Sequence, residues 1–199
     1  MSAALRTRLK IADLTAWTAL DAGRRLLPHG FSLSRLVREE LVLFEPARGF
    51  AADAFEAPLL DAIGKSNFFV NPNKEQFRFL SSKDRGEALE PLSGAWGILT
   101  RPREGTEDAG LLERLLREHP MEGLGAIRKA RIWWLWTKGP GGDAAVKACY
   151  ETLGPVRGPG QGLLANVHSE ATLLLEGAVS WRTIESFLTE PAPAIGAAA

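Results

Sequence analysis

Two short runs of polar side chains are the strongest candidates for chemistry in this sequence. Asparagine and glutamate occupy alternate positions in the first run, and asparagine, histidine and glutamate do so in the second. If each run lies in a strand, its polar side chains project from one side, where they can line a ligand cleft or supply an acid or base. The residues are Asn71, Asn73 and Glu75 in the first run and Asn166, His168 and Glu170 in the second.

A simpler interpretation of the same two runs is structural. Asparagine side chains bond readily to nearby backbone, so each asparagine can begin a kink or turn while the glutamate lies in solvent.

A third hypothesis is an enzyme that uses His168 with Glu170. However, Asn73 stands at the position equivalent to His168, and no hydroxyl or thiol nucleophile is identifiable beside the histidine.

The sequence motifs of common catalytic and cofactor sites do not occur. There is no Gly-x-x-x-x-Gly-Lys-Ser/Thr phosphate loop, no Gly-x-Gly-x-x-Gly, no Gly-x-Ser-x-Gly and no Cys-x-x-Cys. The three histidines are scattered without zinc-type spacing, so we expect no metal and no cofactor. Arg157, within the glycine-rich segment 154–162, is kept as a candidate anion contact, although a flexible loop explains that segment more simply.

The length, charge and cysteine content limit the classes of protein to which this chain can belong. With 199 residues, 45% of them hydrophobic and 24% charged, the chain is long enough for one domain or two small ones. Its 24 Lys and Arg balance 24 Asp and Glu, so we expect no nucleic-acid partner. No apolar run approaches the roughly 20 residues of a membrane span, and no signal peptide is evident. The single Cys149 fits a reducing, cytoplasmic location.

The elements that would position the polar runs form an internal repeat. Residues 68–80 align without a gap on 163–175, which pairs Asn71 with Asn166 and Glu75 with Glu170. Apolar periodicity predicts the strands and helices of each half. In the first half these are a strand at 8–12, a helix at 15–27, a strand at 35–44, a helix at 52–63 and a strand around Asn71. In the second they are a strand at 96–100, a helix at 107–118, a strand at 127–137, a helix at 143–153 and a strand at 162–176. A short helix over 180–189, capped by Ser180, follows.

Each half is therefore β-α-β-α-β, which predicts an α+β protein of two ferredoxin-like repeats forming a pseudo-dimer. The polar, breaker-rich segment 81–91 separates them, so the predicted domains are 1–87 and 88–199, the second with the C-terminal helix and tail. Trp133 faces away from Trp134 and Trp136 on its strand, so both faces of that strand need cover. A core between the repeats is favoured over an exposed partner site.

The end of each half resembles a known family. The run Leu163-Leu164-Ala165-Asn166 with Glu170, echoed by Phe69-Val70-Asn71-Pro72 with Glu75, is similar to the last strand of the small PurS subunit of phosphoribosylformylglycinamidine synthase. Proline usually follows the asparagine in that family, and Val167 stands there in the second half. The family's Asp-Pro-x-Gly turn after the first strand is reduced to Asp13-Leu14-Thr15 in one half and Glu104-Gly105-Thr106 in the other.

The resemblance implies a tandem, fused version of a unit that works as a dimer in that family. It also implies assembly in place of catalysis: a cytoplasmic subunit of purine biosynthesis that bridges a large synthetase subunit and a glutaminase subunit of an ATP- and glutamine-dependent ligase. The polar runs and Arg157 are then candidates for partner or ligand contact. The alternative function is a regulatory module that binds a small molecule between the two repeats. Formation of a homo-oligomer stays open.

Overall fold

The first half of the chain alternates strands with helices. Its elements are β1 (Ala3–Leu9), α1 (Leu14–Leu26), β2 (Leu33–Pro46), α2 (Asp53–Lys65) and β3 (Glu75–Leu80). The second half has β5 (Trp96–Pro102), α3 (Ala109–Glu118), β6 (Leu124–Thr137), helical residues at 147–148 and 152–153, and β7 (Glu170–Leu175). The remaining elements are β4 (Ala88–Leu89), β8 (Val179–Ser180) and α5 (Trp181–Thr189).

These elements belong to a computed structural model that describes residues 2–27, 32–83, 86–138, 147–148, 152–153, 163–166 and 168–192. Cys149, Arg157 and most of the predicted helix at 143–153 lie outside the described residues. Among the described helices, each is too short or too polar to cross a lipid bilayer.

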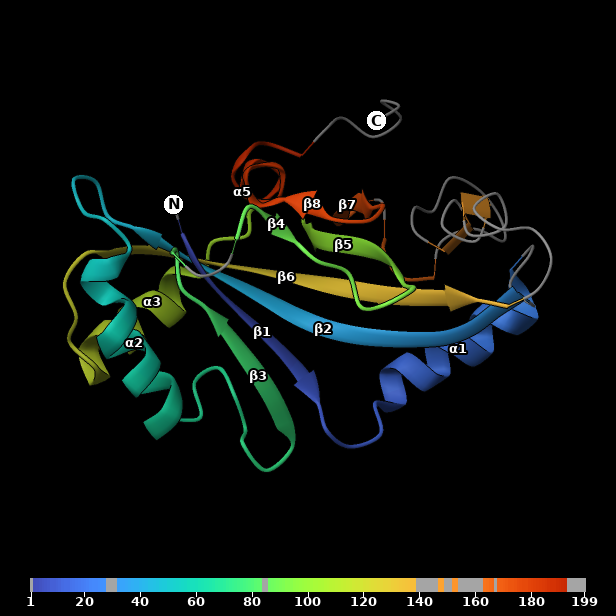
Figure 1. Cartoon of the computed structure of the whole chain (residues 1–199), viewed down its shortest axis with the longest axis horizontal. Helices are drawn as coiled ribbons and strands as arrows, with labels where there is room; N and C mark the ends of the chain where they lie inside the picture. The colour runs from blue at the N-terminus through green and yellow to red at the C-terminus, as the bar shows by residue number, and fades with distance from the viewer. Residues whose placement is uncertain are drawn as a thin grey trace. The chain divides into compact units, whose positions relative to one another are not determined.

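The fold is mixed α+β with an antiparallel sheet whose strand order is β3-β1-β2-β6-β5-β7 (Figure 1). β1 pairs antiparallel with β2 and β3, and β5 pairs antiparallel with β6 and β7. In both halves the first strand therefore lies between the second and the last. β4 and β8 form a separate two-stranded ladder.

Several predicted strand limits were wrong. The first strand covers Ala3–Leu9 and not 8–12, because Ala3, Ala4 and Leu5 are fully buried between two neighbouring strands while Ile11 is 55% exposed beyond the strand end. Because Ala3, Ala4 and Leu5 are apolar at successive positions, this part of the strand has no polar alternation to mark it. The last strand of each half begins only at its glutamate, since the preceding asparagine segments fold as turns. The short β4 and β8 were not predicted.

The chain divides into two compact units, and each combines segments from both halves of the sequence. Unit 1 contains Met1–Ile11, Glu39–Glu87 and Thr106–Ala130. Its core packs α2 and α3 on β1, β2 and β6, with Phe44, Phe55, Leu115 and Ile127 fully buried. The prediction of domains 1–87 and 88–199 concerns the sequence repeat and stays a prediction.

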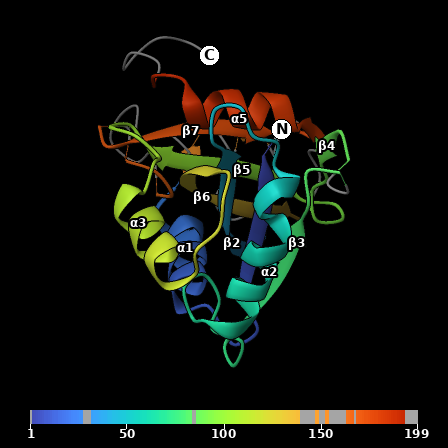
Figure 2. The ribbon, with the colours of Figure 1, turned by 90° about the vertical axis from the view of Figure 1, so that its left-hand side faces the viewer.

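Unit 2 contains Ala12–Arg38, Ala88–Gly105 and Arg131–Ala199. Its core packs α1 on β2, β5 and β6, through Ala16, Leu36, Ile98 and Trp133. The helix α5 lies across β5 and β7 of the same unit, as Figures 1 and 2 show.

The predicted C-terminal helix is confirmed. Ser180 Oγ accepts a hydrogen bond from Thr183 N at 3.2 Å, and Trp181, Ile184 and Leu188 of α5 are buried. A serine at the cap and apolar residues at helical spacing are local signals, so the sequence was sufficient here.

The tryptophan strand is covered on both faces, as predicted. Trp133 is 4% exposed and Trp134 is fully buried. Trp136 is half-buried: its Nε1 donates to Ser93 O at 2.9 Å, and the Arg35 guanidinium lies 4.6 Å from its ring. The core that holds Trp133 contains residues of both halves of the sequence, all within unit 2.

Equivalent aspartates cap the first helix of each half. Asp13 Oδ1 accepts from Ala16 N at 3.1 Å, and Asp13 Oδ2 accepts from Arg38 Nε at 3.1 Å. In the second half Asp108 Oδ1 accepts from Leu111 N at 2.9 Å, and Asp108 Oδ2 accepts from Lys129 Nζ at 2.8 Å. Each aspartate therefore joins a helix N-terminus to a cation on the following long strand.

The structural counterpart of Asp13 is thus Asp108. Glu104, Gly105 and Thr106, set beside Asp13-Leu14-Thr15 as the segment after the first strand, precede the Asp108 cap. The Lys129 ammonium, followed by the Leu111 backbone amide, lowers the pKa of Asp108.

A methyl group at Gly97 is expected to destabilise unit 2. A Cβ there would lie 2.7 Å from Trp134 Cζ3 and 3.0 Å from Leu175 Cβ, its cross-strand neighbours on β6 and β7. Gly97→Ala should lower the free energy of unfolding by about 1–3 kcal/mol, measured by urea denaturation. Gly64→Ala is the control, because a Cβ at Gly64 in α2 meets nothing within 4 Å and should be neutral or stabilising. Equal stability of the two variants would contradict the packing.

Asp108→Asn should reduce the pH dependence of stability. The folded pKa of Asp108 lies below its unfolded value of 3.8, so its contribution is complete above that value and is lost as pH falls through the folded pKa. Its side chain is 36% exposed, so we expect a loss of only a few tenths of a kcal/mol at neutral pH. The decline in unfolding free energy between about pH 5 and pH 3 should become shallower. Glu113→Gln, on the exposed side of α3, should leave that slope unchanged.

Candidate functional site

The first polar run folds as a tight turn that leads into β3. Asn71 O accepts from Lys74 N at 2.9 Å and from Glu75 N at 2.7 Å. The Asn71 side-chain oxygen accepts from Asn73 N at 3.1 Å, and Glu75 Oε2 accepts from Asn71 N at 2.6 Å. The asparagine and glutamate side chains thus close the turn on itself by bonding to its backbone N–H groups.

The second polar run makes the same four hydrogen bonds before β7. Asn166 O accepts from Ser169 N at 3.0 Å and from Glu170 N at 2.6 Å. The Asn166 side-chain oxygen accepts from His168 N at 3.0 Å, and Glu170 Oε2 accepts from Asn166 N at 2.9 Å. We call residues 71–75, and residues 166 and 168–170, the Asn turns.

Each Asn turn is attached to the end of the first strand of its own half. Lys10, the residue after β1, donates its backbone N–H to Lys74 O at 2.8 Å. Arg103, the residue after β5, donates its backbone N–H to Ser169 O at 2.9 Å. Lys10 Nζ also donates to Pro72 O at 2.8 Å. The turns are therefore equivalent in internal bonding and in attachment.

The expectation that the polar residues form a row along a strand was wrong. Asn71, Asn73, Asn166 and His168 precede the strands, and only Glu75 and Glu170 belong to them. The simpler interpretation, in which asparagine bonds to nearby backbone, describes the geometry, except that the glutamates are half-buried and bonded to backbone. The predicted role of these residues in contacts stays a prediction.

The geometry around His168 shows no catalytic pairing within the described residues. The side chain is exposed, and the hydrogen bond of this residue is made by its backbone N–H. In the same part of the chain, no three His, Cys, Asp or Glu side chains lie close enough together to hold a metal ion. Arg157 and Val167 lie outside the described residues.

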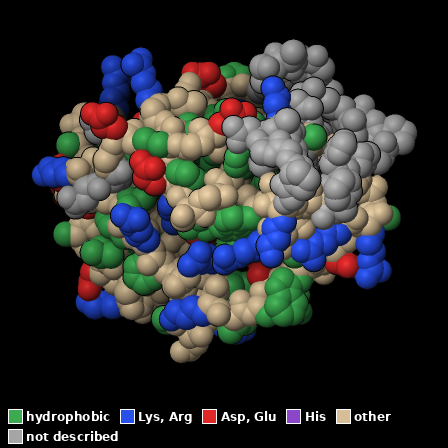
Figure 3. Space-filling model, turned by 45° about the vertical axis from the view of Figure 1, so that its right-hand side comes forward, with side chains coloured by type: hydrophobic (Ala, Val, Ile, Leu, Met, Phe, Trp, Pro, Cys, Tyr) green, Lys and Arg blue, Asp and Glu red, His purple; other side chains and the backbone are tan. Residues whose placement is uncertain are grey.

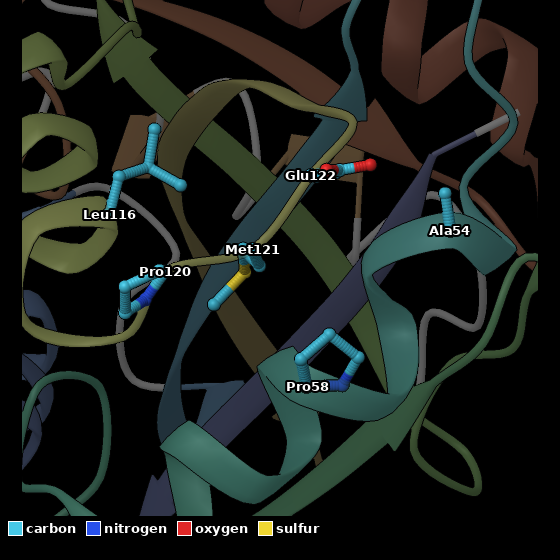
Figure 4. Close-up of a pocket in the computed structure, with 6 residues that line it drawn as sticks. All are labelled: Ala54, Pro58, Leu116, Pro120, Met121 and Glu122. Carbon is cyan, nitrogen blue, oxygen red and sulfur yellow. The ribbon is translucent and has the colours of Figure 1, made fainter.

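A groove in unit 1 was not predicted from the sequence. It has a volume of about 600 Å³ and is lined by Ala54, Pro58, Leu116, Pro120, Met121 and Glu122. Figure 4 shows Ala54 and Pro58 on α2 across from Leu116 of α3 and the loop that carries Pro120 and Met121. The two helices come from different halves of the sequence, so no local signal could have located the groove.

Comparison of the chain with protein-family models, with curated proteins and with solved structures gave no match.

The glutamate of each Asn turn should contribute to stability. Glu75→Ala leaves Asn71 N without its acceptor, which costs about 1 kcal/mol for a half-buried group, and Glu170→Ala should cost somewhat less because Asn166 is exposed. Glu113→Ala, an exposed glutamate in α3, is the control and should change stability by less than about 0.5 kcal/mol. Urea denaturation measures all three, and equal effects at the three positions would contradict the role of the turns.

Proposed function

We propose that this chain is a tandem relative of the small PurS subunit of phosphoribosylformylglycinamidine synthase, built from two ferredoxin-like repeats. The observation that carries the proposal is the identity of the two Asn turns. Both have the same four internal hydrogen bonds and the same attachment to the first strand of their half. The matching Asp13 and Asp108 caps give independent support for duplication of a β-α-β-α-β unit. These turns hold the residues on which the resemblance to the family rests.

The function we propose is assembly in the cytoplasm, as a non-catalytic bridge between a large ATP-dependent synthetase and a glutaminase in purine biosynthesis. In the Asn turns the asparagine and glutamate side chains bond to the backbone of the turn. Such groups fix the shape of a surface and have little freedom to exchange protons with a substrate. Two equivalent, preformed turns in one chain suit the contact of a subunit with protein partners.

A second candidate function is a regulatory module with a small molecule between the repeats. The groove favours it, because its walls come from α2 of the first half and from α3 and the following loop of the second. Its volume lies within the range of small-molecule sites.

The proposal is tested by capture of partners on the tagged full chain from native lysate at moderate salt. The large synthetase and the glutaminase should be recovered together. The double variant Asn71→Ala with Asn166→Ala should lose them, since each change removes the bond that shapes one turn. Asn67→Ala, an exposed asparagine outside the turns, should retain both partners.

Recovery of neither partner on the unaltered chain would contradict the bridging function. A metabolite that raises the melting temperature would then favour the regulatory module, because a ligand that binds the folded state stabilises it. Equal recovery on all variants would place the contact away from the Asn turns.

A further inference from the structure

The ribbon formed by β1 and β3 in unit 1 gathers positive charge on one face. In its register Arg6 lies opposite Arg78, and Arg8 lies opposite Gln76. Leu5 and Phe79, at the intervening positions, pack into the core, so the arginines project from the other face. Lys10 and Lys74 follow at the end of the ribbon. We name this set the β1–β3 basic face: Arg6, Arg8, Lys10, Lys74 and Arg78.

Glu39 pairs with two of these cations. Glu39 Oε2 accepts from Arg6 Nη2 at 2.5 Å, and Glu39 Oε1 lies 4.0 Å from Arg8 Nη1. The Glu39 side chain is 7% exposed, so it is enclosed by its partners. The side chains of Arg78 and Lys74 are exposed and make no hydrogen bond or ion pair with described residues. Positive charge therefore exceeds negative charge on this face, although the whole chain has a formal net charge of zero.

The ion pair with Glu39 accounts for Arg6, whose side chain is 10% exposed, but among the described residues no such pair accounts for Lys74 and Arg78. Like charges directly opposite each other on paired strands destabilise the pair, and Arg78 lies opposite Arg6 without the carboxylate partner that Glu39 gives to Arg6. Any polar residue would serve on a solvated strand face, as Gln76 does between Lys74 and Arg78. The cost of these repulsions falls when an anionic partner neutralises the cations. Figure 3 shows Lys and Arg side chains gathered close together on the surface of the molecule.

The side chains around the cations favour one kind of anionic ligand over the others. Phe77 and Phe79, the aromatic residues of β3, occupy positions that alternate with Gln76 and Arg78, so the basic face has none of the stacking platforms that bind single-stranded nucleic acid. Small phosphate compounds are bound in concave sites, whereas the arginines of this face stand along two strands and its lysines directly beyond the strand ends. Within a row, side chains two residues apart are separated by about 6.6–6.8 Å. Carboxylates at alternate positions of an extended peptide have the same spacing, and carboxylates four residues apart have the spacing of Lys74 and Arg78.

We propose that the β1–β3 basic face binds an extended acidic segment of a protein partner, with Asp or Glu at alternate positions. The inference goes beyond the proposed function, because it concerns a charged strand face and holds whichever protein supplies the segment.

The test is fluorescence anisotropy of a labelled ten-residue peptide of alternating Glu and Thr, titrated with the full chain at low ionic strength. The unaltered chain should bind it, and the double variant Lys74→Gln with Arg78→Gln should weaken binding roughly tenfold. The control variant, Arg117→Gln with Arg182→Gln, makes the same change in charge at exposed positions of α3 and α5 and should bind like the unaltered chain. Unfolding curves confirm that the variants are folded.

Two further probes separate the sources of negative charge. A peptide with Gln in place of Glu should not bind, and neither an oligouridylate of similar length nor inorganic phosphate should displace the Glu peptide at equal concentration. Equal weakening by the two double variants would overturn the proposal. Preferential binding of oligouridylate would overturn it in favour of nucleic acid, and displacement by phosphate would overturn it in favour of a small anion. None of these results alters the partner capture, which rests on the Asn turns.

Discussion

The length of β2 and β6 is the constraint on which the rest of the structure depends. Each strand has 14 residues, an extension of about 46 Å at roughly 3.3 Å per residue, where a typical strand has about 5–6 residues. Each strand contributes residues to both compact units. β2 places Leu36 in the core with α1 and Phe44 in the core with α2 and α3. An amphipathic helix is stable only where a sheet buries its apolar face, so the two ends of each long strand give the helices of both halves their packing surfaces.

In both halves, carboxylate and amide side chains of the kind found in catalytic sites accept hydrogen bonds from backbone N–H groups. The first N–H groups of a helix and the N–H groups of a tight turn lack partners and must be satisfied. Asp13 and Asp108 satisfy those of α1 and α3, and the Asn turns satisfy their own. These carboxylates and amides therefore shape the backbone.

The net charge of the chain does not show where its charged side chains are paired and where they are not. Arg128 of β6 lies 2.7 Å from Glu45 and 3.3 Å from Thr106 Oγ1, so that guanidinium is held within the fold. Arg78 of β3 has no such neighbour among the described residues and stands opposite another arginine. Composition counts both residues as arginine, so it does not distinguish a guanidinium paired within the fold from one without such a partner. The position of each arginine in the sheet decides whether its guanidinium is paired within the fold.

The sequence by itself determined the helices at 15–27, 52–63, 107–118 and 180–189, the alternation of strands and helices, and the equivalence of Asn71 with Asn166. Helix periodicity, caps and repeated spacing are properties of neighbouring residues, so they can be read locally. The tertiary structure decided between the two interpretations of the asparagine runs, in favour of turns. It alone decided that the first strand begins at Ala3 and that α1 and α3 pack with segments of the other half. Each of these outcomes depends on a partner distant in the chain, such as the Lys10 N–H that holds the first Asn turn at Lys74 O. The register and burial that bring such partners together are set by the packed sheet and by no single segment of the sequence.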